Sequence, residues 1–282
     1  MEEGDNFFMA KPFSFIHQTV YFSMYLSISI AVLLYKKLFI NKIQYGILIF
    51  LGIGVLQTLN KAGIIILFLI LGIKFYSLLK KKIYAVLVFF LFFCFGALVF
   101  ISNPRLRAFN ANFTIDKSQI KVKDFKVMPN SNPSKTNTRI LLWASAIDLI
   151  SERPIFGIGA GGSNQKLSEV YAVKAQWYDK RHRFNVHNQY LQISLDIGIV
   201  GLIVFILLFV FLGKAIFYAN SKGDKMLILN FMLLVGMNFL FESVFERYSG
   251  ISFFCLFYCL MVYLPLENND KYGLSLNTFF KN

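Results

Sequence analysis

A histidine and an asparagine, His187 and Asn188, lie where a long polar stretch of the sequence meets an apolar run. Earlier apolar segments end near Ser102, so this pair closes an interruption in an otherwise hydrophobic chain. Ionisable and polar side chains at a membrane boundary are costly to keep dry, and their presence there marks a candidate site. Because histidine changes its protonation state near neutral pH, His187 is a candidate for proton transfer.

Two carboxylates and two further histidines are secondary candidates. Asp196 follows His187 by nine residues in the same expected helix, and Glu242 lies at the end of a later apolar run. Nine helical residues rise about 13.5 Å over about two and a half turns, so His187 and Asp196 face opposite ways and cannot touch. We expect each carboxylate to make a buried polar contact to another helix, although an intramembrane carboxylate is a functional candidate by default. His17 and His182 are the remaining histidines.

The elements that must position these residues are membrane helices. The chain has 282 residues, of which 56% are hydrophobic and 33 are Phe. A soluble domain cannot bury so much apolar surface, so we expect an all-α integral membrane protein, since helices satisfy their own backbone groups in lipid. The three cysteines fall inside apolar segments, where cysteine behaves as a small hydrophobic residue, so no metal site is expected. The sequence shows no nucleic-acid signature.

Apolar runs long enough to cross a hydrocarbon core of about 30 Å predict about seven transmembrane helices. The runs lie at about 16–35, 43–60, 62–79, 83–102, 190–213, 226–242 and 249–266. The predicted organisation is therefore four helices in residues 1–102, an external loop in 103–189, three helices in 190–266 and a tail in 267–282.

Lysine positions predict the orientation of the chain. Short lysine-bearing loops at 36–42, 74–82 and 214–225, and the C-terminal tail, are expected in the cytoplasm. The loop 103–189 is expected outside, because long loops translocate regardless of charge. It carries 14 basic and six acidic residues, and such a surface suits anionic partners such as diphosphates or phosphorylated glycolipids.

The external loop is expected to contain two helices separated by a glycine-rich turn. A polar loop with a short strand at 119–127 precedes an amphipathic helix at 138–150, which should lie at the membrane interface with Trp143 as an anchor. The turn at 154–162 does not fit a dinucleotide-binding motif, because a helix and not a strand precedes it. A tight turn is the favoured interpretation, and an anion site made of backbone amides is the alternative. A second helix is expected at 164–180.

Several motifs in order along the chain resemble the O-antigen ligase and polymerase superfamily, in particular its Bacteroidetes-like members. They are Arg139-x-x-x-Trp143, Arg153-Pro154-x-x-Gly157-x-Gly159, His187-Asn188-x-x-Leu191, Asp196-x-Gly198-x-x-Gly201 and Phe241-Glu242-Ser243-Val244-Phe245-Glu246-Arg247-x-x-Gly250. The resemblance covers about residues 45–260. Two features depart from it. Lys61 stands where the family carries an arginine, which keeps the charge and loses the bidentate fork. Family members also have more spans, so we expect further helices before Met1.

The resemblance implies transfer of a glycan from undecaprenyl diphosphate to an acceptor hydroxyl such as that of lipid A–core. The reaction would take place on the periplasmic face of the bacterial inner membrane, without a metal or cofactor. His187 would be the base, while Arg139 and Lys61 would stabilise the departing diphosphate. The implied substrate-binding residues are Asn188, Arg153, Arg183, Gly157 and Gly159, with Asp196, Glu242 and His17 as secondary positions.

Other functions are compatible with parts of this pattern. Within the same class, the chain could be a polysaccharide polymerase or a protein O-oligosaccharyltransferase. A transporter would predict broken helices at mid-membrane, paired intramembrane charges and an internal repeat. The sequence shows no convincing repeat, and its charges concentrate outside the apolar runs. A non-catalytic fragment of a larger enzyme is a further alternative.

Overall fold

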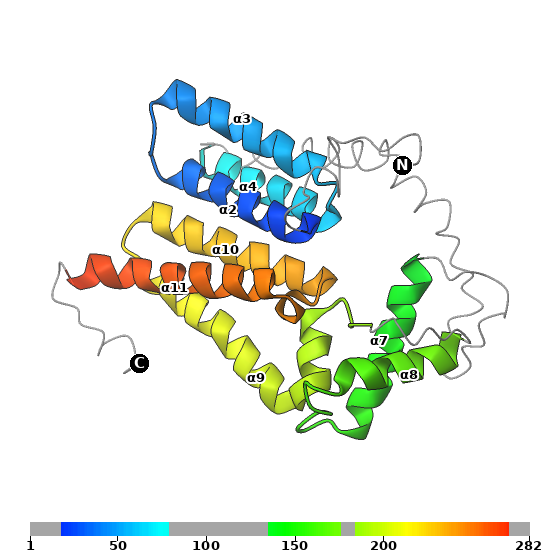
Figure 1. The fold of residues 1–282 in the computed structure, drawn as a ribbon. Helices are drawn as coiled ribbons and strands as arrows, with labels where there is room; N and C mark the ends of the chain where they lie inside the picture. The colour runs from blue at the N-terminus through cyan, green and yellow to red at the C-terminus, as the bar shows by residue number, and fades with distance from the viewer. Residues whose placement is uncertain (1–17, 79–134, 176–183, 271–282) are drawn as a thin grey trace, which may run out of the picture. The chain divides into compact units, whose positions relative to one another are not determined.

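The computed structural model describes residues 18–78, 135–175 and 184–270. Within these ranges the regular secondary structure is entirely helical, as Figure 1 shows, which confirms the all-α prediction for the described residues. The α-helices are α2 (Thr19–Tyr35), α3 (Asn41–Gln57), α4 (Lys61–Leu78), α7 (Lys135–Glu152), α8 (Ser163–Ala175), α9 (Gln189–Tyr218), α10 (Lys222–Phe241) and α11 (Tyr248–Asp270). A short 3₁₀ helix, η2 (Val244–Glu246), joins the last two.

Three of these helices, α4, α9 and α10, are long and apolar enough to cross a membrane. Two shorter apolar helices are α2 and the Tyr248–Tyr263 part of α11. Six of the expected apolar segments coincide with helices, whereas the run at 83–102 and the strand at 119–127 lie outside the described residues. The chain is thus a helical membrane protein, while a total of seven spans stays a prediction.

The helices form two compact units. Unit 1 contains α2, α3 and α4, together with Leu208–Asn238 and the chain from Arg247 onward. Unit 2 contains α7, α8, the part of α9 up to Leu207 and the segment Phe239–Glu246. The chain passes from one unit to the other inside α9 and again near the end of α10.

Unit 1 is held by aromatic packing and by one ion pair at the lysine-rich end of α2. The helix α2 packs against α3, α4 and α11, and the ring of Tyr25 meets Phe253 edge to face with centroids 4.9 Å apart. Lys36 Nζ lies 2.5 Å from Oδ1 of Asp224, whose side chain is only 2% exposed. Asp224 is in the first turn of α10, where a carboxylate also interacts favourably with the helix dipole. This pair ties the end of α2 to the start of α10.

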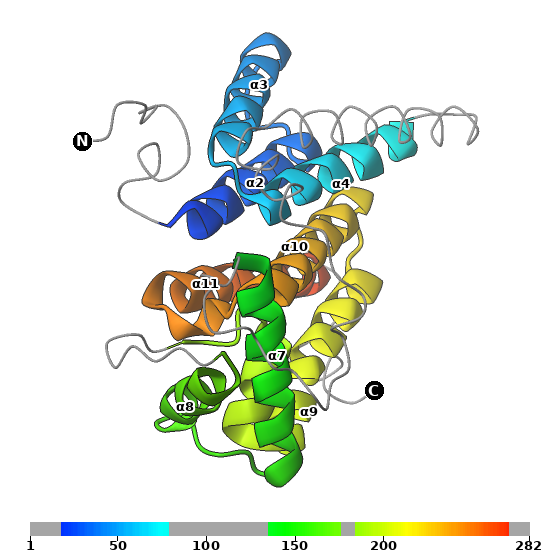
Figure 2. The ribbon, with the colours of Figure 1, turned by 90° about the vertical axis from the view of Figure 1, so that its right-hand side faces the viewer.

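Unit 2 has its own apolar core. Figure 2 shows the helices that contribute to it, α7, α8 and the start of α9, in the same part of the ribbon. The core side chains from α7 are Leu141, Leu142, Ala146 and Leu149, and those facing them are Leu167, Tyr171, Val186 and Leu195. Burial of each large apolar side chain stabilises the unit by about 1.5–3 kcal/mol. The apolar face of α7 is therefore used inside unit 2, and a position of this helix at the membrane interface stays a prediction.

Candidate functional site

The helix α9, expected to be continuous, is broken at Gly198, which has φ 72° and ψ −161°. The break separates the amides of Ile199 and Val200 from the carbonyls that they would meet in a continuous helix. Both amides find acceptors in the glycine-rich turn instead. Ile199 N donates to Pro154 O at 2.8 Å, and Val200 N donates to Ile155 O at 3.4 Å.

The two carbonyls left behind by the break are satisfied by the same turn. Leu195 O accepts from Ile158 N, and Asp196 O accepts from Gly159 N, each at 2.9 Å. The turn and the break therefore exchange four backbone hydrogen bonds in place of two helical ones. Interrupted helices in membrane proteins need such partners, because a buried backbone group without one is costly.

Two glycines make this close approach of backbones possible. A Cβ on Gly157, which has φ +67°, would lie 2.6 Å from the carbonyl carbon of Asp196. A Cβ on Gly198 would come even closer to the carbonyl group of Ile155. The amides of Gly157 and Gly159 both donate to backbone carbonyls, at 3.0 and 2.9 Å. Because these donors are occupied, the geometry favours the tight-turn interpretation over an anion site.

The start of α9 is shaped by the asparagine that follows the candidate histidine. Oδ1 of Asn188 accepts hydrogen bonds from Tyr190 N at 3.0 Å and from Leu191 N at 3.1 Å, which is an N-cap geometry. His187 has φ +51°, a conformation that non-glycine residues rarely adopt, and its amide donates to Asn185 Oδ1 at 3.2 Å. The cap and this turn place His187 directly before the helix.

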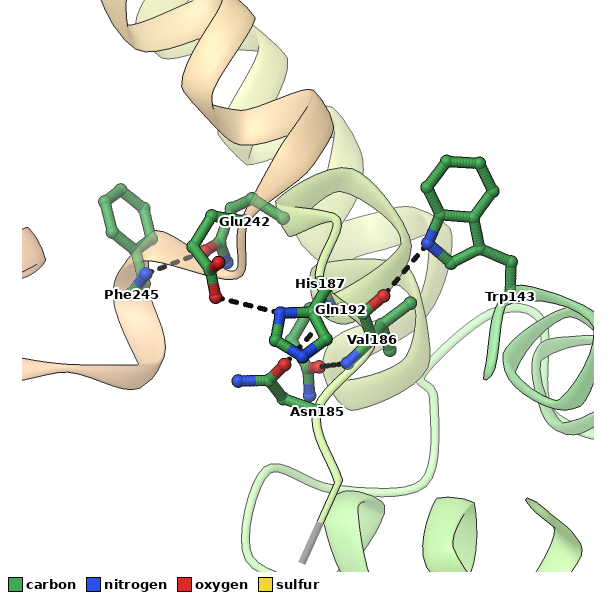
Figure 3. Close-up of polar contacts among 8 residues, drawn as sticks. Trp143, Asn185, Val186, His187, Gln192, Glu242 and Phe245 are labelled. Atoms are coloured by element: carbon green, nitrogen blue, oxygen red, sulfur yellow. Dashed lines mark hydrogen bonds and ion pairs between the residues drawn. The ribbon is translucent and has the colours of Figure 1, made fainter. Parts of the chain in front are cut away.

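Val186, the residue before His187, has hydrogen-bond partners for both its backbone carbonyl and its backbone amide. Trp143 Nε1 on α7 donates to Val186 O at 3.0 Å, and Val186 N donates to Gln192 Oε1 at 3.0 Å (Figure 3). The Val186 side chain is fully buried in the core of unit 2. The expected membrane anchor Trp143 thus has a defined partner inside the protein, next to the candidate base.

The imidazole of His187 points toward Glu242, as Figure 3 shows. Nδ1 of His187 lies 3.1 Å from Oε1 of Glu242, and the two side chains are 35% and 14% exposed. An ionised carboxylate only accepts hydrogen bonds, so the contact is made when Nδ1 carries the proton. That tautomer leaves the lone pair of Nε2 available, which is the form that a general base needs.

The pairing of His187 with Glu242 cannot be predicted from the sequence. They are 55 positions apart, and no local pattern relates them. Glu242 was expected to contact another helix; it contacts the turn that precedes α9. The segment that carries it is further held by Gln189, whose Oε1 accepts from Phe245 N at 2.7 Å.

Arg139 belongs to unit 2, as His187 does. It is exposed on α7 and precedes Trp143 by four residues, so the two side chains are neighbours on one face of the helix. Trp143 in turn touches the residue before His187. Arg153 follows the other end of α7, about 21 Å along the helix axis from Arg139. Arg153 is next to Pro154, whose carbonyl accepts a hydrogen bond from Ile199 at the α9 break.

The remaining candidates have other environments. Lys61 is the first residue of α4 in unit 1, after a turn in which Leu59 has φ +50° and Asn60 Nδ2 donates to Ser23 Oγ at 2.6 Å. Asp196 is half-buried and accepts from Gln192 Nε2 at 3.1 Å, on its own helix. The candidates outside the described residues are His17, His182 and Arg183.

Comparison with known protein families gives one match. The sequence model of the family described as O-antigen ligase matches residues 46–206, which is more than half of the chain. The matched range contains α7, α8 and the start of α9, with Arg139 and His187, whereas Glu242 lies beyond it. No curated protein matches the chain.

Proposed function

We propose that the chain, which belongs to the O-antigen ligase family, transfers a glycan from undecaprenyl diphosphate to an acceptor hydroxyl such as that of lipid A–core. The family supports a ligase-like membrane glycosyltransferase, and the proposal adds the donor, the acceptor and the periplasmic face of the inner membrane. The observation that carries the proposal is the contact between His187 Nδ1 and Glu242 Oε1, because it prepares a base inside the matched region.

His187 is the proposed general base. As the acceptor oxygen attacks the first carbon of the donor glycan, its proton passes to Nε2 of His187, and the bond from that carbon to the diphosphate oxygen breaks. The imidazole becomes a cation in this step, and the carboxylate of Glu242 at 3.1 Å stabilises it while holding the ring in place. The reaction needs no change in oxidation state.

Arg139 is the proposed partner of the departing diphosphate. Its guanidinium is exposed, remains charged at any relevant pH and binds phosphate oxygens with two parallel hydrogen bonds. The proposal is supported by its spacing of one helical turn from Trp143, which binds the residue before His187. Arg183, four residues before His187 in the sequence, is proposed to contribute further positive charge, and Asn188 to contact substrate.

The function is tested in cells that lack their own O-antigen ligase. Expression of the wild-type protein should restore a surface glycan, and the Arg139→Ala variant should lower transfer about 100-fold because one charge-assisted contact to the leaving group is lost. Arg139→Lys should keep part of the activity, since lysine keeps the charge without the fork. Lys166→Ala, an exposed cation on α8, is the matched control and should transfer normally.

The gel pattern of the surface glycan separates the related activities. Loss of all glycan in the variant supports a ligase, whereas single repeat units that remain attached indicate a polymerase. Glycan that appears on protein points to a protein transferase. Full activity of Arg139→Ala would contradict the role assigned to this residue.

We expect removal of the Glu242 carboxylate to lower the rate of transfer. The Glu242→Gln variant keeps the size of the side chain and loses its negative charge, so the imidazolium formed during transfer is less stabilised. We expect kcat to fall about 10- to 100-fold with little change in KM, because the lost interaction belongs to the transition state. Steady-state transfer in detergent with a lipid-linked donor measures both constants. Glu152→Gln, at the exposed end of α7, is the control, and an equal loss in that variant would contradict the assignment.

A further inference from the structure

Gln192 is the most fully hydrogen-bonded polar side chain around the candidate base among the described residues. It lies on α9 one turn after Asn188 and is 1% exposed. Its Oε1 accepts from Val186 N at 3.0 Å, while Nε2 donates to Asn164 Oδ1 and to Asp196 Oδ1, each at 3.1 Å. Both amide protons and the carbonyl are therefore in use, which fixes the orientation of the group.

The hydrogen bond from Val186 to Gln192 constrains the backbone next to His187. Val186 is bound through its amide by Gln192 and through its carbonyl by Trp143, and His187 follows directly. His187 has φ +51°, which is an unfavourable conformation for a residue with a side chain. Such a conformation persists only where neighbouring contacts impose it, and the fixed Val186 peptide supplies that constraint.

The hydrogen bond from Gln192 to Asn164 leads to the segment that carries Glu242. Asn164 accepts from Gln192 with Oδ1 and donates with Nδ2 to Glu246 Oε2 at 2.8 Å. Glu246 ends the short helix η2, four residues after Glu242. Hydrogen bonds thus connect Gln192 to Val186, the residue before His187, and through Asn164 to Glu246 in the segment that carries Glu242.

We propose that Gln192 is a positioning residue that sets the distance and orientation of His187 relative to Glu242. This inference rests on the proposed function, because the geometry it controls is that of the proposed base. Gln192 does not touch the reacting atoms. It acts through Val186 on one side and through Asn164 on the other, and a displacement of about 1 Å at such a pair lowers the rate of reaction about 100-fold.

Two substitutions separate the contact of Gln192 with Val186 from its contact with Asn164. Gln192→Leu removes every contact, and we expect kcat to fall about 10- to 100-fold with KM changed less than about threefold. Asn164→Leu removes the contacts to Gln192 and Glu246 and leaves the bond from Val186 N to Gln192, so its kcat should fall less than that of Gln192→Leu. Gln165→Leu is the matched control, because Gln165 is exposed on α8 and donates to Glu169 on the same helix. Wild-type kcat in Gln192→Leu would overturn the proposal.

A double substitution distinguishes positioning from a general loss of stability. If Gln192 acts through the catalytic pair, Gln192→Leu should add less than about a threefold loss in kcat when Glu242 is already alanine. A merely structural role would give losses that multiply. The second result would overturn the proposal, even if the single variants were impaired.

A chemical measurement makes the inference independent of glycan transfer. Diethyl pyrocarbonate modifies imidazole nitrogens, and peptide mass spectrometry follows its reaction at His187 separately from the other two histidines. We expect Gln192→Leu to change the modification rate of His187 at least about threefold, while Gln165→Leu leaves it unchanged. A changed rate in a protein without transferase activity would sink the proposed function alone, and an unchanged rate would sink the positioning role alone.

Discussion

The His187→Asn variant should lose glycan transfer by about a thousandfold or more, because a positioned general base contributes about 10²- to 10⁴-fold to such reactions. Asparagine is chosen because it tolerates a positive φ better than most residues, and His187 has φ +51°. The backbone before α9 should therefore keep its path. The amide of asparagine takes up no proton at neutral pH, so only the chemistry is removed.

Transfer from a lipid-linked donor in detergent, and surface glycan in ligase-deficient cells, both measure this loss. The thermal midpoint of the purified variant should stay within about 4 °C of that of the wild-type protein, which corresponds to less than about 1–2 kcal/mol. Lys166→Asn, on the exposed face of α8, should retain full transfer. If His187→Asn retained more than a tenth of the wild-type rate, another group would have to serve as the base.

The Gly198→Ala variant should fail to accumulate as a folded protein. An alanine at φ +72° is itself unfavourable by about 1–2 kcal/mol, and its Cβ would collide with the backbone of Ile155. Relief of that collision separates the turn from the break and breaks the four backbone hydrogen bonds between them, each of which contributes about 0.5–1.5 kcal/mol. The combined loss of about 4 kcal/mol or more is a large share of the stability of a typical domain.

Expression yield, gel filtration in detergent and the thermal midpoint measure this effect. The control Gly213→Ala lies on the same helix, where a Cβ would meet nothing within 4 Å. Gly161→Ala is a second control in the turn itself, again with open space around the new methyl group. Both should fold as the wild-type protein does. Normal yield and stability of Gly198→Ala would show that the exchange of hydrogen bonds between the turn and α9 is dispensable.

Much of the fold was predictable because it depends on composition and on short-range patterns. Apolar runs of membrane length predicted six of the described helices, and apolar residues at helical spacing predicted the region of α7. The interpretation of residues 154–162 as a tight turn followed from the glycines and from the preceding helix. The break in α9 was not predicted, because Gly198 inside an apolar run of normal length gives no local sign of an interruption.

The sequence by itself determined that this protein is a helical membrane protein with His187 and Asn188 at the start of a span, since residue type and chain position suffice for that. Only the tertiary structure decided what these residues touch. The carboxylate facing His187 comes from 55 residues away, and Gln192 reaches Val186, Asn164 and Asp196 at once. Periodicity reports which face of an element is apolar, whereas hydrogen bonds between distant segments depend on the path of the backbone. The contact between His187 and Glu242 and its supporting network are therefore properties of the folded chain.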